Sequence, residues 1–314
     1  LVRAGITSLV IAAQGSQIRG HLIPTAVISG QITESVRAAA EKAHRRIIES
    51  VLEDRQVDLI HFHGLDFLSY RPHYERIPQL ATLHLPVAWY PSDLFRQSNL
   101  HLNCVSESQA ASHPAAQSLP VVRNGIDVER FRPSARKQEF LLWLGRVCPE
   151  KGVHIALRVA HKMNLPLIIA GPIHPFSAHQ NYFNQEVFPL LDERRRYIDA
   201  ISVGEKASLL ASARCLLVPS LAAETSSLVA MEAISSGTPV VAFRSGALPE
   251  IVEDQVTGFI VDSGDEMADA VLKIDSISPE ACRAVASARF AGQRMVDDYI
   301  ALYERIITAQ SVGE

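Results

Sequence analysis

The chain has 314 residues, a length that exceeds most single domains and predicts two domains. Apolar residues make up 47% and charged residues 20% of the sequence, an ordinary soluble composition with ample material for cores. The formal net charge of −4 argues against a general nucleic-acid-binding or anionic-membrane surface. No apolar run reaches the length of a membrane span, and no signal peptide is visible.

The cysteines are scattered along the chain and form no CxxC pair, which argues against a metal-binding or disulfide framework. We interpret them as reduced core thiols of a cytoplasmic protein. They are Cys104, Cys148, Cys215 and Cys282.

The first half of the sequence alternates short apolar runs with helical patterns. LVRAG is typical of the end of a helix with Gly5 as its stop, so we expect the chain to begin inside a fold. A strand over 7–13 follows, and apolar residues recur at helical spacing over 33–52. Further strands are predicted at 57–64, 79–86, 100–106 and 119–125.

A linker is predicted at 124–138, where Asn-Gly and Pro interrupt the pattern, and a second alternating series follows it. Two such series predict an α/β protein with two doubly wound, Rossmann-like parallel sheets, whose ligands bind at the carboxyl ends of strands. The predicted strands are 140–145, 165–171, 197–202, 215–220 and 239–243, and the predicted helices are 153–163, 205–213, 225–236 and the amphipathic 294–307.

The loop WLGRVCPEKG (143–152) is the first candidate site, because it places two cations between a strand and a helix. Arg146 and Lys151 could neutralise a diphosphate, while Gly152 opens a helix whose backbone N–H groups could donate to it. The alternative is two solvated surface cations.

The stretch AAETSSLVAMEAISSGTPVVAF (222–243) is the second candidate, because it places two carboxylates eight positions apart. At about 100° per residue, Glu224 and Glu232 could both face one cleft and bind vicinal hydroxyls of a sugar or ribose. The small Ser226 and Ser227 would let backbone N–H groups approach a phosphate or sugar. The alternative is that Glu224 caps the helix and Glu232 is a surface residue. This suits Glu224 well, but it fits Glu232 poorly because the neighbours of Glu232 are apolar.

These motifs, together with NGID followed by Phe131 and Pro133, and with GALPEIVEDQVTGFIV, resemble the retaining glycosyltransferases of family 4. That family has the GT-B fold, two Rossmann-like domains that face a cleft, and a Glu-x7-Glu motif. The resemblance covers most of the chain and is strongest from Asn124 to Val261. It implies an acceptor-side domain at 1–125, a nucleotide-sugar donor domain at 126–292 and a helix at 293–314 that packs back toward the first domain.

The resemblance also implies a role for each candidate residue. Arg146 and Lys151 would hold the diphosphate, Glu224 the donor-sugar hydroxyls and Glu232 the ribose hydroxyls. The backbone of the loop and helix start would contact the sugar and phosphates, and the glycines beside the two cations would shape their loop. These backbone contributors are Ser226, Ser227, Leu228, Gly145 and Gly152.

Two departures from the family pattern are visible. The family has Phe-Gly-Leu where this chain has Ser226-Ser227-Leu228, which would restrict the backbone if that position needs a positive φ. We expect this chain to lack the family's first strand and Gly-rich loop, which border acceptor and donor phosphates, so that the acceptor-side domain is N-terminally incomplete.

Three histidines in the first half form the last candidate group. His61 and His63 share a strand face and could ligate a metal only with a third ligand, so packing is the favoured interpretation for His61. His84, in TLHLP, matches the strand-end histidine that the resembling enzymes place under the donor sugar.

The predicted function is a retaining glycosyltransferase that moves a sugar from a nucleoside-diphosphate sugar to a hydroxyl of a sugar, lipid or small-molecule acceptor. The resemblance implies no cofactor and no metal. The alternatives are a non-catalytic or truncated nucleotide-sugar-binding protein and a GT-B epimerase. The nucleobase, donor sugar, acceptor and oligomeric state have no marker in the sequence.

Overall fold

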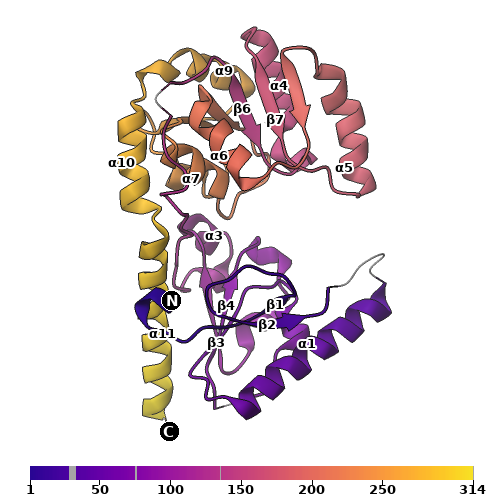
Figure 1. The fold of residues 1–314 in the computed structure, drawn as a ribbon, viewed down its shortest axis with the longest axis vertical. Coiled ribbons are helices and arrows are strands. Elements are labelled where there is room, and N and C mark those ends of the chain that lie inside the picture. Colours follow the sequence, from indigo (N-terminus) through magenta and orange to yellow (C-terminus); the bar gives the residue numbers. More distant parts are fainter. Residues whose placement is uncertain (28–32, 75, 135, 314) are drawn as a thin grey trace. The chain divides into compact units, whose positions relative to one another are not determined.

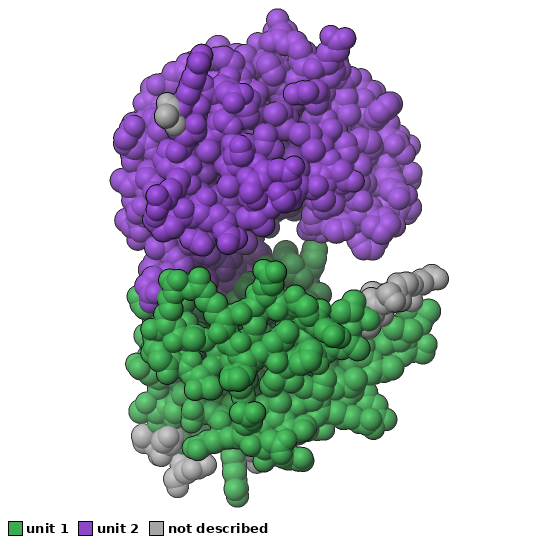
Figure 2. Space-filling view, viewed as in Figure 1, with its two compact units in different colours: residues 1–103, 296–314 green, residues 104–295 purple. Residues whose placement is uncertain are grey.

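The computed structural model describes residues 1–27, 33–74, 76–134 and 136–313. Its internal contacts divide the chain into two compact units (Figures 1 and 2). One unit combines Leu1–Asn103 with Val296–Glu314, and the other is Cys104–Met295. Figure 2 draws the first unit in green and the second in purple.

The division falls at Asn103, whereas the sequence predicts a boundary at residue 125. The segment between the two positions groups with the second unit because of its contacts there. The Glu250 carboxylate accepts the backbone N–H groups of Glu107 and Ser108 at 3.1 and 2.6 Å.

The second unit contains a six-stranded parallel sheet with the order β11-β10-β9-β6-β7-β8. The central strands β6 and β9 are buried along their whole length, as expected for a parallel sheet covered on both faces. The strands are β6 Leu141–Leu144, β7 Leu167–Ala170, β8 Arg195–Ile198, β9 Cys215–Val218, β10 Val240–Phe243 and β11 Gly258–Val261.

Helices connect these strands and cover the sheet (Figure 1). The chain leaves β6 in one direction and β9 in the other, so right-handed crossovers place α4 and α7 on opposite faces. Helix α4 packs on α9, and α7 packs on α6 and α10. The bounds are α3 Glu107–Ala111, α4 Val153–Lys162, α5 Ser177–Tyr182, α6 Val203–Ser212, α7 Leu228–Ser235, α8 Leu248–Ile251, α9 Gly264–Leu272 and α10 Pro279–Arg289.

The first unit has two smaller sheets in its described part rather than the single sheet that the sequence predicts. One pairs β1 with β2 in parallel, and the other has the order β3-β4-β5. No strand is predicted where β2 lies, because Pro24 falls within it and proline disfavours a strand interior. The elements are β1 Leu9–Ala13, β2 His21–Thr25, α1 Glu34–Asp54, β3 Ile60–Phe62, α2 Phe67–Tyr70, β4 Gln79–Leu83, β5 Leu100–Cys104 and α11 Gly292–Gly313.

Two local expectations differ from the structure. The run 119–125 forms only the isolated bridge at Val121, because Pro120 has no N–H to donate to a ladder. Strand β8 begins at Arg195, earlier than predicted. Within the predicted linker 124–138, Ala135 lies outside the described residues. None of the helices in the described ranges has a stretch both long and apolar enough to cross a bilayer.

Candidate functional site

The strand order of the second unit creates one position where its chain reverses direction across the sheet. Strands β6, β7 and β8 extend to one side of this position and β9, β10 and β11 to the other. In open parallel sheets a crevice forms there, outside the carboxyl ends of the two central strands. The loops that follow β6 and β9 therefore border the expected ligand crevice. The first loop carries Arg146 and Lys151, and the second carries Glu224.

Lys151 and Glu224 face each other from these two loops. Lys151 Nζ lies 2.5 Å from Glu224 Oε1, and the Ser220 hydroxyl donates to the same oxygen at 2.5 Å. The side chains are 29% and 11% exposed, so the pair is reachable from solvent yet largely shielded. Ser220 has no functional signal in the sequence, because a serine at a strand end is common.

Arg146 lies on the same loop as Lys151 and is exposed. No hydrogen bond or salt bridge joins its guanidinium to another residue of the described part of the chain. Its five N–H donors therefore remain available to an anion. Gly145, which precedes it, ends β6 with a φ of 154°.

Gly152 allows the two loops to approach each other closely. Its φ is 64°, and a Cβ at this position would lie 2.1 Å from the Pro219 carbonyl oxygen. The backbone N–H of Leu221 also donates to the Glu150 carbonyl oxygen at 2.8 Å, which links the loops a second time. The meeting of Lys151 with Glu224 thus depends on a backbone approach that only glycine permits.

The start of α7 offers backbone donors beside Glu224. The first helical residue is Leu228, and the preceding Ser227 makes no side-chain cap. Within the described residues, no backbone hydrogen bond is donated by Ser226, Ser227 or Leu228, and the Ser226 hydroxyl is buried without a partner. Such a helix start is suited to an anion or to the oxygen atoms of a sugar.

Ser227, where the resemblance noted in the sequence implies a glycine, does not strain this loop. Ser227 has a φ of −134°, an extended conformation that any residue adopts. The loop is instead supported by Gly246, where a Cβ would lie 2.2 Å from the Glu224 carbonyl oxygen, and by the Ala247 N–H, which donates to that oxygen at 2.7 Å.

Glu232 lies one turn into α7 and is buried, with a side chain 9% exposed. Its Oε1 lies 2.7 Å from Lys206 Nζ, and Lys206 also lies 5.2 Å from the centre of the Phe131 ring. Burial raises the pKa of the Glu232 carboxyl, and the Lys206 ammonium opposes this shift. The sequence does not single out Lys206, because a lysine on an amphipathic helix is usually a solvated surface residue.

His84 belongs to the first unit, where it follows the end of β4. Its Nε2 lies 3.0 Å from His63 Nδ1, and its backbone N–H donates to the Tyr90 hydroxyl at 3.1 Å. Burial lowers the pKa of His84, which favours the neutral imidazole at pH 7. The structure thus groups Lys151, Glu224 and the start of α7 in the second unit and places His84 with His63 in the first.

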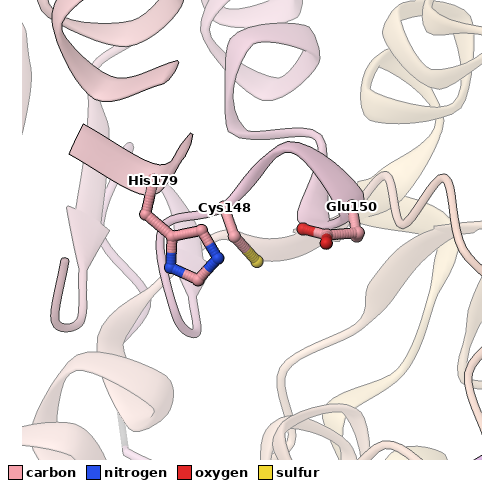
Figure 3. A group of neighbouring side chains, drawn as sticks. All are labelled: Cys148, Glu150 and His179. Carbon is pink, nitrogen blue, oxygen red and sulfur yellow. The ribbon is translucent and has the colours of Figure 1, made fainter. Parts of the chain in front are cut away.

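Cys148, Glu150 and His179 form the one group among the described residues that could hold a metal ion. One ligand atom from each lies within 4.8 Å of the others, and Figure 3 shows the thiol between the imidazole ring and the carboxylate. The thiol already donates to the Arg146 carbonyl oxygen at 3.5 Å. Burial raises the pKa of Cys148 to about 11, whereas metals bind the thiolate. That no metal is required stays a prediction.

Comparison with known sequences gives a family model for the second unit. The model for Glycosyl transferases group 1 matches residues 126–289, just over half of the chain. A D-inositol 3-phosphate glycosyltransferase of Mycolicibacterium smegmatis is 32% identical over 218 residues, covering 62% of this chain and 50% of that protein. The protein of that name from Corynebacterium efficiens is 35% identical over 169 residues, covering 47% and 40%. The chain spans about half the length of the curated relatives it matches.

Solved structures resemble a larger part of the chain. Sucrose-phosphate synthase from Thermosynechococcus elongatus has a TM-score of 0.74 at 19% identity, covering 89% of this chain and 81% of that chain. The Anabaena protein Alr3699/HepE in complex with UDP-glucose has a TM-score of 0.67 at 19% identity, with 82% of each chain covered. At this identity the likeness shows the fold alone, and it confirms the expected α/β architecture of the GT-B kind.

We predict that Gly152→Ala destabilises the second unit and weakens ligand binding at its crevice. The new methyl group would have to move the Pro219 carbonyl at a left-handed φ, at a cost of roughly 1–3 kcal/mol. Thermal unfolding should show a lower midpoint. Gly204→Ala in α6 is the matched control, because its Cβ meets nothing closer than 4.0 Å and alanine favours a helix. Equal midpoints for both variants would contradict the role given to Gly152.

Proposed function

Because the chain belongs to the group 1 glycosyl transferases, we propose that it is a retaining glycosyltransferase that uses a nucleoside-diphosphate sugar as donor. The observation that carries the proposal is the Lys151–Glu224 pair beside the start of α7, at the reversal point of the second unit's sheet. A diphosphate needs cations and N–H donors, and a sugar needs hydrogen-bond acceptors for its hydroxyls. This part of the chain supplies both within two loops.

In this proposal the donor lies along the two loops. Arg146 and Lys151 bind the diphosphate, with the N–H groups at the start of α7 donating to its oxygens. Glu224 accepts hydrogen bonds from hydroxyls of the sugar, and its contact with Lys151 links the sugar end of the donor to the phosphate end. The complex of the Anabaena protein with UDP-glucose supports this class of donor, although it concerns another protein of low identity.

Glu232 binds the ribose hydroxyls in this proposal, and Lys206 is its partner before the nucleotide arrives. A buried carboxylate without a partner would be costly, and the Lys206 ammonium offsets part of that cost by favouring the charged form of Glu232. The carboxylate has two oxygens, and the ion pair involves Oε1. Ribose hydroxyls can therefore donate to the carboxylate while the ion pair persists.

Transfer breaks the bond between the anomeric carbon and the phosphate oxygen and forms a bond from that carbon to the acceptor oxygen. The acceptor's proton passes to the departing phosphate, so no protein nucleophile is needed for retention. Arg146, Lys151 and the helix N–H groups stabilise the charge that develops on the diphosphate. Two cations at this position make a metal ion unnecessary in this proposal.

The acceptor is assigned to the first unit, with His84 contacting the sugar or acceptor near the reacting carbon. A sugar, a lipid or a small polyol could each supply the hydroxyl. Inositol phosphates are the first acceptors to test, because the curated relatives are named D-inositol 3-phosphate glycosyltransferases.

A nucleotide survey followed by a transfer assay tests the proposal. A ligand at a hundred times its dissociation constant adds about 2.7 kcal/mol of stability, so thermal shifts with UDP, GDP and ADP should identify one diphosphate. The matching sugar donor should then glycosylate an acceptor, and proton NMR of the product should show the donor's anomeric configuration. Nucleotide binding without sugar transfer would favour the non-catalytic alternative. Epimerisation of the donor sugar in the absence of an acceptor would favour an epimerase, and a product with inverted anomeric configuration would exclude retention.

We predict that Lys151→Ala weakens binding of the nucleoside diphosphate about 10- to 100-fold while barely changing binding of the nucleoside. The reason is that a charge-assisted bond to phosphate contributes about 1.5–3 kcal/mol, which only the diphosphate can use. Isothermal titration calorimetry measures both affinities. Lys162→Ala, which removes an exposed lysine paired with Asp265, is the control. Equal losses for nucleoside and diphosphate would argue against a phosphate contact.

We predict that Glu232→Ala weakens binding of the ribonucleotide and removes discrimination against its 2′,3′-dideoxy analogue. The wild-type protein should prefer the ribonucleotide, because only ribose hydroxyls can donate to the carboxylate. Since the variant leaves Lys206 without its acid, Glu232→Ala with Lys206→Met separates the loss of the ribose contact from that of the ion pair. Glu193→Ala, at an exposed position, is the control. Discrimination retained by the variants would exclude the ribose role.

A further inference from the structure

Three histidines of the first unit, His61, His63 and His84, belong to a network of hydrogen bonds and one ring contact that reaches from helix α11 to His84. His61 is its centre, since both of its ring nitrogens have a partner. His61 Nδ1 lies 2.7 Å from the Tyr303 hydroxyl and His61 Nε2 lies 2.7 Å from Thr82 Oγ1. The inference drawn from this network rests on the proposed function, because it concerns the role given to His84.

The direction of each hydrogen bond follows from the number of protons available. Thr82 has one hydroxyl proton and donates it to Asn103 Oδ1 at 2.7 Å. Its other neighbours must then donate to Thr82, so Tyr299 donates at 3.0 Å and His61 carries its proton on Nε2. His61 Nδ1 is left as an acceptor, and the Tyr303 hydroxyl donates to it. The tautomer of His61 is therefore set by its partners.

His61 also stays neutral, which this pattern requires. Burial is the largest cause that lowers its pKa, and together with the neighbouring His63 and His84 it brings the pKa to about 2. A protonated ring would place a second N–H against the Tyr303 hydroxyl, whose own proton points at the same nitrogen. The network thus holds His61 in one orientation and one protonation state.

His63 connects this fixed ring to His84. The His61 and His63 rings pack with their centroids 4.0 Å apart and 39° between their planes. On its other side, His63 Nδ1 shares one hydrogen bond with His84 Nε2 at 3.0 Å. One of these two nitrogens must carry a proton and the other must accept it, so the state of each ring determines the state of the other.

We propose that His63 is a positioning residue for His84 and that Tyr303 supports it through His61. His84 follows the end of β4, and His63 Nδ1 is the ring partner whose distance to His84 Nε2, 3.0 Å, is within hydrogen-bonding range. The bond to His63 fixes the direction of the ring and which nitrogen faces the substrates. Loss of this bond should lower the turnover rate, because small errors in the placement of a reacting group are costly.

The experiment compares His63→Ala with His63→Asn, because the side-chain amide of asparagine can place a polar atom near the position of Nδ1. We expect kcat to fall about 10- to 100-fold in the alanine variant and to recover largely in the asparagine variant, with KM for the donor unchanged. Tyr303→Phe should lower kcat in the same direction and to a smaller extent. His73→Ala, at an exposed position of the same unit, should have no effect.

Nitrogen-15 NMR of the imidazole rings provides a readout that does not depend on activity. The wild-type protein should show His61 as the Nε2–H tautomer, and the His84 nitrogen shifts should change in His63→Ala and return toward wild type in His63→Asn. Unchanged His84 shifts in the alanine variant would overturn the proposal whether or not transfer is observed. Altered shifts with unchanged kcat would equally overturn it. A wild-type protein without transfer activity would contradict the proposed function, and the NMR result alone would then show whether His63 positions the His84 ring.

Discussion

The close approach of two loops in the second unit is the constraint on which the candidate donor site depends. The backbone of Gly152 meets the Pro219 carbonyl, and this contact brings the loops after the paired strands β6 and β9 close enough for Lys151 to reach Glu224. The strand order determines where a crevice is expected, but the strands would tolerate many loops. Glu224 and Lys151 meet because the residue at which the two loops cross, Gly152, has no side chain.

The fold of the second unit could largely be predicted from the sequence because its signals are local. Apolar runs of four or five residues alternate with helical spacing from β6 to β10, and the order of these elements favours a doubly wound sheet. The first unit was harder to predict. Pro24 conceals β2, and the division of its strands into two sheets depends on pairings between distant segments, which no local pattern records.

The candidate site was predictable where a residue type is unusual in its surroundings. Glu232 could be predicted as a site residue because it is an acid among apolar neighbours. Arg146 and Lys151 could be predicted because both follow a strand. Lys206 gave no such signal, since its importance comes only from its distance to Glu232. The extended backbone of Ser227 could be recognised only in the structure, because sequence alone does not reveal whether a loop position needs a positive φ. The His63–His84 hydrogen bond could not be predicted either, because it joins residues that follow two different strands.

The two units differ in how their chain segments are distributed. The second unit is continuous from Cys104 to Met295, whereas the first combines the beginning of the sequence with the helix residues from Val296 onward. On a ribosome, the second unit can fold once its own residues have emerged, but Tyr299 and Tyr303 emerge only after the whole of that unit. The partners of His61 and Thr82 on α11 therefore arrive only after the second unit has been made, so the first unit is completed after the second although its strands are synthesised before it.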